Sequence, residues 1–445
     1  MKLWEKGIEP DPAIIEFTTG NDRETDLLLS GWDIVGSMAH VIMLAEVKLI
    51  SGDEKSDLLN ALHSLFLKAI NGDMVIEKGV EDIHSQIEND LTAILGPVGK
   101  KVHTARSRND QILLDIRLFT RAETDRLAIK AYSLFTRMQA LSEQFHEFLV
   151  PGYTHMQPAM LSSFGLWFGG YAEALSDDLY ILSGVRKLNN RSPLGSAAGY
   201  GTTLPVNRKL TAELLEFDDI IYNSSYASLN RGKVEMAVGG AIASLANTLS
   251  RFSMDVCLFM STELKFIEFP DEFVTGSSIM PQKRNPDVFE IVRARSNSLQ
   301  TLPNQISMIT NNLPSGYNRD MQLLKSLIFN SFVQMGEILD ILVFMLGGIK
   351  VRRNITEDPI YNSIFSTEEV NRLVRSGIPF RDAYKAVAGM VKNGTFSKTQ
   401  PSDYTHEGSI GNLCNEEIRK RAERIMKTFR DTPITELEAK LMKYL

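Results

Sequence analysis

Cysteine and histidine, the residues that most often hold transition metals, are scarce in this chain of 445 residues. The two cysteines, Cys257 and Cys414, form no CxxC pair, and the seven histidines show no HExxH or other zinc-binding spacing. Cysteines so few and so far apart in the sequence indicate reduced, structural thiols in a reducing compartment. We therefore expect no bound metal, and we predict a cytoplasmic protein.

Motifs for nucleotide, nucleic-acid and membrane binding are also missing. The chain contains neither GxGxxG nor GxxxxGK followed by Ser or Thr, so nothing predicts a nucleotide cofactor. The net charge of −7 leaves no basic excess to neutralise the phosphates of a nucleic acid. The most apolar stretch, residues 341–349, is too short for a bilayer, and residues 1–6 lack the apolar core of a signal peptide. We expect no cofactor, no nucleic acid and no membrane among the partners.

Long helical patterns dominate the sequence. Leu324, Leu327, Ile328 and Met335, for example, recur at helical spacings and mark one buried face. No convincing alternation of polar and apolar residues predicts a strand. Several long helices joined by short polar connections predict an all-α protein built on a long bundle. The helical patterns cover residues 112–150, 161–188, 234–266, 286–310 and 319–346.

The chain is long enough for two or three domains. Residues 1–105 are predicted to form an N-terminal helical domain, and residues 106–352 the central bundle. From residue 353 the helical patterns become shorter and mix with a polar stretch that contains glycine and threonine, at residues 392–411. We therefore predict a small C-terminal helical domain over residues 353–445.

The most informative segment is Gly276-Ser-Ser-Ile-Met-Pro-Gln-Lys-Arg-Asn-Pro-Asp287. It is typical of a small-residue loop that leads into a helix, with Asn285 as N-cap and Pro286 at the first helical position. Two serines, Lys283 and Asn285 near a helix N-terminus favour an anion site. A flexible surface connection before a capped helix is the structural alternative.

This string closely resembles the shared motif of the fumarase/aspartase superfamily, and Gln282 resembles the version found in the argininosuccinate lyase family, to which the lens protein delta-crystallin is related. Further segments match that family in the expected order, and the similarity extends from about residue 33 to residue 346. These segments are His103-Thr-Ala-Arg-Ser-Arg-Asn-Asp-Gln111, Gly152-Tyr-Thr-His-Met-Gln-Pro158 and Leu313-Pro-Ser-Gly-Tyr-Asn-Arg-Asp320, followed by Gln322 and Lys325.

The resemblance implies a three-domain fold of the fumarase/aspartase type and a homotetramer whose active sites combine motifs from three subunits. It also implies that the chain eliminates fumarate from L-argininosuccinate to give L-arginine, the last step of arginine biosynthesis, without a cofactor. In this interpretation Ser277 removes the proton, Lys283 stabilises the aci-carboxylate, and His155, oriented by Glu290, protonates the leaving nitrogen.

The remaining candidates are predicted to bind the substrate. Ser107, Arg108 and Asn109 precede a long helix, where a guanidinium and an amide suit a carboxylate, although a capped helix with a surface arginine is the plainer interpretation. Gln322 and Lys325 lie three residues apart on one helical face. By resemblance, Thr154 and Asn285 assist at the carbanion and His84 lines the site, although a capping or core role competes for this histidine. The candidates for the amino-acid end are Arg231, Tyr317, Gln322, Lys325 and Asp26.

The sequence departs from the family at the expected amino-acid end. Asp22 stands where a serine is expected, and its carboxylate would repel a substrate α-carboxylate yet attract an α-ammonium. Leu3-Trp4 is not followed by the usual Gly-Gly-Arg-Phe, and Gly232 replaces a commonly acidic residue. Either the arginine end binds differently or the amine is modified. The alternative hypotheses are a sister lyase acting on another N-succinyl compound, a non-catalytic protein of the delta-crystallin kind, and a helical scaffold.

Overall fold

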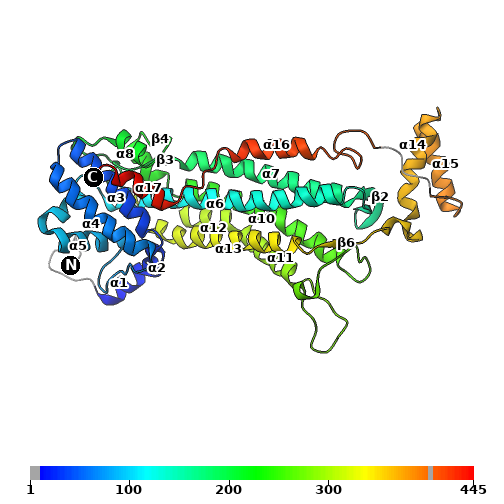
Figure 1. The fold of residues 1–445 in the computed structure, drawn as a ribbon, viewed down its shortest axis with the longest axis horizontal. Helices are drawn as coiled ribbons and strands as arrows, with labels where there is room; N and C mark the ends of the chain where they lie inside the picture. The colour runs from blue at the N-terminus through cyan, green and yellow to red at the C-terminus, as the bar shows by residue number, and fades with distance from the viewer. Residues whose placement is uncertain (1–10, 399–403) are drawn as a thin grey trace.

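Long helices that run side by side form the centre of an elongated molecule (Figure 1). The structure, a computed structural model, describes residues 11–398 and 404–445, so the departure at Leu3-Trp4 lies outside the described residues. The predicted all-α class and the long bundle are confirmed. In the bundle, α6 packs on α7 and α13, and α10 packs on α7, α11 and α12. The bundle helices are α6 (Arg108–Gln144), α7 (Phe164–Asn189), α10 (Lys233–Phe259), α11 (Asp287–Leu299), α12 (Leu302–Thr310) and α13 (Leu323–Leu346).

A β-hairpin lies where the sequence predicted the end of the helix over 112–150 and the start of the helix over 161–188. The helix predicted over 112–150 ends at Gln144, and Leu149–Thr154 (β1) pairs antiparallel with Gln157–Ser163 (β2). Pro151 and Pro158, which helix interiors do not tolerate, end the helical pattern at this point. The helix predicted over 286–310 is likewise broken before Pro303, which stands in the first turn of α12. The helix predicted over 234–266 ends at Phe259, before the short strand β5 (Ile267–Glu268) that pairs with β6 (Lys350–Val351).

Helices of the first segment gather at one end of the bundle (Figure 1). There α3 packs on α4 and on α6, and η1 packs on α5. These elements hold the N-terminus of α6 in place. They are α1 (Pro12–Thr19), α2 (Asp22–Leu27), α3 (Ser30–Glu46), α4 (Gly52–Ile70), α5 (Ile83–Leu95) and the 3-10 helix η1 (Gly96–His103).

The last segment does not stay together in space. α14 (Ser366–Arg375) and α15 (Phe380–Lys392) form a hairpin at the far end of the molecule (Figure 1). By contrast, α16 (Asn415–Met426) packs along α7 and α6, and α17 (Ile434–Met442) reaches α3 at the opposite end. The helices of residues 353–445 therefore contact different parts of the molecule, and the three-way division of the chain stays a prediction. The short elements in between are β3 (Arg191–Ser192), α8 (Arg208–Leu214), β4 (Asp219–Ile220), α9 (Ser224–Leu229), η2 (Asp271–Phe273), η3 (Arg319–Gln322), η4 (Ile355–Glu357) and η5 (Pro359–Phe365).

The longest apolar helical stretch is longer than residues 341–349, which the sequence analysis judged too short for a bilayer. Within the described residues, Arg319–Gly347 is long and apolar enough to cross a membrane by length and composition alone. Half of its most apolar window is buried inside the protein, where Phe329 packs on Phe119 with ring centroids 4.1 Å apart. A core helix of a bundle has this same composition.

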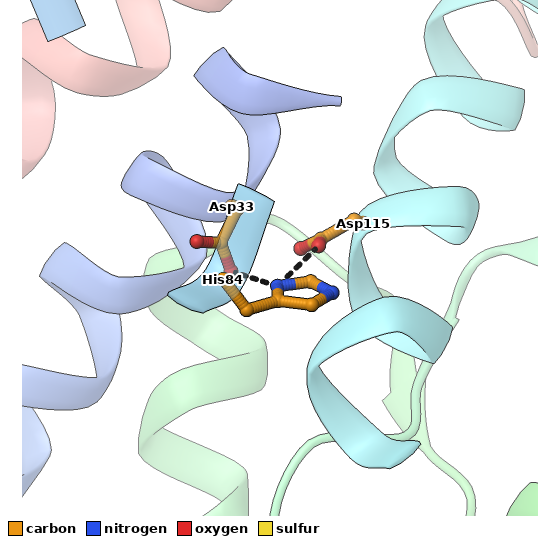
Figure 2. A group of neighbouring side chains, drawn as sticks. All are labelled: Asp33, His84 and Asp115. Atoms are coloured by element: carbon orange, nitrogen blue, oxygen red, sulfur yellow. Dashed lines mark hydrogen bonds and ion pairs between the residues drawn. The ribbon is translucent and has the colours of Figure 1, made fainter. Parts of the chain in front are cut away.

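A buried ion cluster joins three helices near the N-terminus of α6. Figure 2 shows His84 of α5 between Asp33 of α3 and Asp115 of α6. His84 Nδ1 lies 3.0 Å from Asp33 Oδ1 and 3.6 Å from Asp115 Oδ2. Burial alone would lower the pKa of His84, but the negative charges of Asp33 and Asp115 raise it to about 10. The histidine is therefore an imidazolium at neutral pH, and its charge holds the two carboxylates together.

The same three residues group donors of the kind that bind metal ions, with ligand atoms within 4.8 Å of one another. However, a protonated Nδ1 cannot coordinate a metal. The buried guanidinium of Arg106, which donates to Ser37 Oγ at 2.9 Å, adds a second positive charge beside Asp33 and Asp115. Burial and the charge of Asp33 raise the pKa of Asp115 well above its ordinary value, while His84 and Arg106 oppose the rise. The positive charges of His84 and Arg106 therefore favour an ion cluster over a metal site.

Replacing His84 by asparagine should test this cluster through its pH dependence. The folded pKa of about 10 exceeds the ordinary 6.5, so the stabilisation is fully present below pH 6.5 and is lost as the pH rises through 10. We expect His84→Asn to lower the free energy of unfolding at pH 6.5 by about 3 kcal/mol. The difference from the unmodified protein should shrink towards pH 10, as measured by urea denaturation followed by circular dichroism.

His63→Asn is the matched control, because His63 forms a more exposed ion pair with Glu438, at 2.6 Å. Its effect should be smaller. If the deficit of His84→Asn were equally large at both pH values, His84 would have to be neutral in the folded protein.

Candidate active site

A cavity of about 160 Å³ lies where α2, the start of α5 and the start of α6 meet the segment that leads into α13. Most of the residues predicted to bind the substrate line it, although they come from distant parts of the chain. Those are Asp26, His84, Arg108, Asn109, Arg231, Tyr317, Gln322 and Lys325. The rest of the lining is Thr19, Asp22, Glu81, Asp82, Ile112 and Arg319.

The N-terminus of α6 presents Arg108 and Asn109 to the cavity. Ser107 caps this helix, because its hydroxyl accepts from the backbone N–H of Asn109 at 3.2 Å while Asp110 accepts from the backbone N–H of Ser107 at 2.9 Å. The helix dipole therefore adds positive potential next to the guanidinium. Ser107, predicted to bind substrate, does not line the cavity; its hydroxyl acts as the helix cap.

The guanidinium of Arg108 already has ion-pair and hydrogen-bond partners within the protein. Its Nη1 lies 3.0 Å from Glu81 Oε2 and 3.1 Å from Asp82 Oδ2, and its Nη2 donates to Ser85 Oγ at 2.6 Å. Burial would raise the pKa of Asp82, but the charges of His84 and Arg108, together with hydrogen bonds from Ser85, hold it below its ordinary value. A substrate carboxylate must displace at least one of these acidic groups to bind Arg108.

Lys325 forms a second charged centre on the cavity wall. Its Nζ lies 2.5 Å from Asp22 Oδ1 and 2.5 Å from Asp26 Oδ1. Gln322 Nε2 donates to the backbone oxygens of Thr18 and Thr19, at 3.1 Å each. Gln322 and Lys325 thus face the cavity from one side, as their spacing predicted, and they fix the segment that joins α1 to α2.

Arg231 is held by the scaffold. Its Nε lies 2.9 Å from Glu235 Oε1, and its Nη2 donates to the backbone oxygen of Met321 at 2.8 Å. Glu235 also accepts from the backbone N–H of Gly232 at 2.8 Å. Gly232 has φ +81°, and an added Cβ would lie 2.6 Å from Thr310 Cγ2. The glycine at this departure from the family is therefore required by the backbone.

His155 stands at the tip of the β1–β2 hairpin, away from the cavity. Thr154 pairs with Gln157, and the two residues of the turn, His155 and Met156, have φ +53° and +61°. Positive φ at both positions is the geometry of a type I′ turn, which normally uses Asn or Gly. This strained backbone displays an exposed imidazole, and such outliers concentrate at functional sites. Neither Thr154 nor His155 lines the cavity.

The loop before α11 carries Ser277. The backbone N–H groups of Met280 and Ile279 point at Ser277 Oγ, at 3.2 and 3.4 Å. Asn285 was predicted to cap α11, and this was wrong: the capping position falls on Pro286, and Asn285 Nδ2 donates instead to the oxygen of Gly276 at 3.1 Å. Because Asn285 also donates its backbone N–H to Thr275 O at 2.9 Å, it closes the base of the loop.

Lys283 and Glu290 are exposed in the single chain. Neither lines the cavity, nor does Ser277 or Asn285. Within the described residues of one chain, the predicted orientation of His155 by Glu290 has no ion pair to support it, since both side chains point into solvent. The single chain therefore brings together eight of the eleven residues predicted to bind the substrate, and it leaves the four residues predicted to be catalytic apart from them.

Sequence reasoning missed several cavity residues. Glu81 and Asp82 pair with Arg108, and Arg319 Nη2 lies 3.1 Å from Glu81 Oε1. One signal was available for Asp82, because Asp directly before a helical pattern is a preferred N-cap residue, and Asp82 does accept from the backbone N–H of Ser85. No local signal existed for Glu81, whose partners lie far along the chain.

Proteins of known family resemble this chain over most of its length. A family profile described as lyase matches residues 9–300. An argininosuccinate lyase of Bacteroides fragilis is 50% identical over 441 residues, covering 99% of each chain, and one of Parabacteroides distasonis is 48% identical with the same coverage. A solved structure of an EDDS lyase variant with bound fumarate superimposes with a TM-score of 0.75 at 20% identity, covering 98% of this chain and 96% of that chain.

The profile covers well over half of the chain, and the two relatives match it almost from end to end. The structural likeness is independent of this sequence identity and concerns the fold alone. The chain therefore belongs to the fumarase/aspartase superfamily of lyases and, within it, to the argininosuccinate lyase family.

Proposed function

We propose that the protein is a carbon–nitrogen lyase that eliminates fumarate from L-argininosuccinate and releases L-arginine, the last step of arginine biosynthesis. The full-length identity to argininosuccinate lyases is the observation that carries this function. The cavity supports it, because cationic groups suited to carboxylates line a pocket that also holds groups suited to an amino acid.

The chemical difficulty is the weak acidity of the carbon beside a carboxylate. A base removes the proton from that carbon, the electron pair forms the new double bond, and the C–N bond breaks with its electrons on nitrogen. Stabilising the doubly charged aci-carboxylate is the main requirement, and positioned cations and amides are the strongest means available. Lys283 is our candidate for this role, assisted by Thr154 and Asn285.

Ser277 is our candidate for the base. A free hydroxyl is a poor base, so its pKa must be lowered by groups that stabilise the alkoxide. The two backbone N–H groups that point at Ser277 Oγ support this assignment, and the cation of Lys283 on the same loop would add to it. His155, with Glu290 to orient it, is the candidate acid for the leaving nitrogen.

The fumarate end of the substrate would bind to Arg108 and Asn109 at the positive end of α6. His84 lines the cavity next to them, but its Nδ1 is engaged by Asp33, so we assign it the task of holding the wall in place. Asp26, Arg231, Tyr317, Gln322 and Lys325 are left for the amino-acid end. We propose no cofactor, metal or nucleic acid as a requirement, and a cytoplasmic location.

We further propose a homotetramer in which each site takes residues from several subunits. The 37 residues of α6 separate Arg108 from the hairpin that carries His155, which amounts to about 55 Å at 1.5 Å per residue. One chain cannot close that distance without breaking the helix. Apolar side chains exposed on bundle helices, such as Ile291, Met308, Val333 and Phe344, support burial between chains.

Purified protein mixed with argininosuccinate should form ultraviolet-absorbing fumarate without added metal or nucleotide. Ser277→Ala should lower kcat by about 100- to 10,000-fold, the usual contribution of a positioned base. The neighbouring Ser278→Ala is the matched control and should stay within a few-fold. Unchanged turnover by Ser277→Ala would remove the base assignment.

The same assay separates the alternative functions. Turnover of adenylosuccinate in place of argininosuccinate would retain the reaction class and discard the substrate. Folded protein inactive on both would favour a structural role of the delta-crystallin kind.

Mixing two inactive variants should test the shared site. Arg108→Ala and Ser277→Ala each remove a residue that we place in a different subunit of the same site. After subunits of the two variants exchange at random, about a quarter of the sites receive both intact residues, so activity should return to about a quarter of normal. Lack of recovery, with mixed tetramers confirmed by native mass spectrometry, would place both residues in one chain.

A further inference from the structure

The cavity contains an unusual row of charges, with one ammonium between two carboxylates. Lys325 is only 4% exposed, and Asp22 and Asp26 each lie 2.5 Å from its Nζ. One positive charge cannot neutralise both, so the row carries a surplus negative charge at this wall of the cavity. The surplus is what a cationic group of a ligand would encounter.

The other cations of the cavity are committed elsewhere. Arg108 pairs with Glu81 and Asp82, and Arg319 pairs with Glu81. Arg231 pairs with Glu235. None of these guanidinium groups forms an ion pair with Asp22 or Asp26 in the part of the chain that the structure describes. The charge of Arg319 acts on Asp22 from a greater distance, so Asp22 has no direct cationic partner of its own beyond the shared Lys325.

The two carboxylates of the row differ in access. The side chain of Asp26 is 2% exposed, and its second oxygen lies 3.4 Å from the backbone N–H of Ile83, so it is enclosed by the scaffold. The side chain of Asp22 is 19% exposed and lines the cavity, on the short helix α2. Partial burial raises the pKa of Asp22 while Lys325 opposes the rise, as expected for a carboxylate poised for a second cation.

We propose that Asp22 binds the α-ammonium of the amino-acid end of the substrate, while Lys325 binds the adjacent α-carboxylate. This inference rests on the proposed function and adds the identity of a specificity-determining residue to it. A zwitterionic amino acid presents an ammonium and a carboxylate side by side, and the Asp22–Lys325 pair is its complement. On binding, Asp22 and Lys325 give up their ion pair with each other, and each forms an ion pair with the substrate.

The consequence is selection for a free α-amine. An N-acylated amine carries no charge and adds bulk, so it would leave Asp22 unpaired in a partly buried wall, which binding strongly disfavours. Of the two explanations for Asp22 that the sequence left open, this proposal favours the first. The arginine end binds through Asp22 in place of the usual serine, and its α-amine is unmodified.

The experiment measures binding of three probes by calorimetry, to the unmodified protein and to Asp22→Asn. L-Arginine carries both groups, N-acetyl-L-arginine lacks the α-ammonium, and agmatine lacks the α-carboxylate. Losing a hydrogen bond to a charged group should weaken L-arginine and agmatine by about 10- to 100-fold in the variant. N-Acetyl-L-arginine should bind weakly to both proteins and change little.

Asp320→Asn is the matched control, because Asp320 is an exposed carboxylate that does not line the cavity, although its neighbour Arg319 does. It should leave all three affinities within about two-fold, as expected for a surface charge. Turnover of argininosuccinate by Asp22→Asn should show a raised KM with kcat little changed, because the amino-acid end binds alike before and during the reaction.

The possible failures are distinguishable. If the unmodified protein does not turn over argininosuccinate, the proposed function falls and the assignment of Asp22 falls with it. If turnover is normal but Asp22→Asn binds L-arginine as before, the inference alone is overturned. Equal weakening of all three probes, accompanied by a lower melting temperature, would make Asp22 a structural clamp on Lys325 and would also overturn it.

Discussion

The length of α6 is the constraint on which the rest of the molecule depends. This helix has the candidate anion site at its N-terminus and leads into the His155 hairpin at its C-terminus, and it is rigid between them. The residues that we propose for one reaction therefore lie at opposite ends of a rod, which is the reason for proposing a site shared between chains. In that proposal the bundle has two tasks: it buries the apolar stripes of its own helices, and it sets the spacing at which a second subunit docks.

Ion pairs hold most of the charged side chains around the cavity. Each cation on its wall has a carboxylate partner that holds its side chain in place, while the row of Asp22, Lys325 and Asp26 keeps one negative charge in excess. In the binding mode that we propose, the substrate exchanges protein ion pairs for ion pairs of its own, which limits the desolvation penalty that buried ions normally suffer. The imidazolium of His84 lines the cavity and joins α3, α5 and α6 through Asp33 and Asp115.

The sequence was a good guide wherever the signal was local or ran over many residues. Helical periodicity found the bundle, and ordered motifs found most of the cavity lining. It failed where partners come from afar: Glu81 meets Arg108 through tertiary structure alone. It also failed where two local rules competed. Asn285 is a good N-cap residue, but the closure of its loop by hydrogen bonds to Gly276 and Thr275 takes precedence over capping. The hairpin was missed because its buried residues fit the periodicity of the adjoining helices, and only the prolines argued otherwise.

The contact between α17 and α3 has a consequence for the order of folding. The last helix of the chain covers one of the first, and Glu438 lies 2.6 Å from His63. During synthesis α17 emerges after the N-terminal helices that it covers, so these helices have an apolar surface uncovered until α17 packs on them. Contacts between segments so far apart in the sequence slow folding.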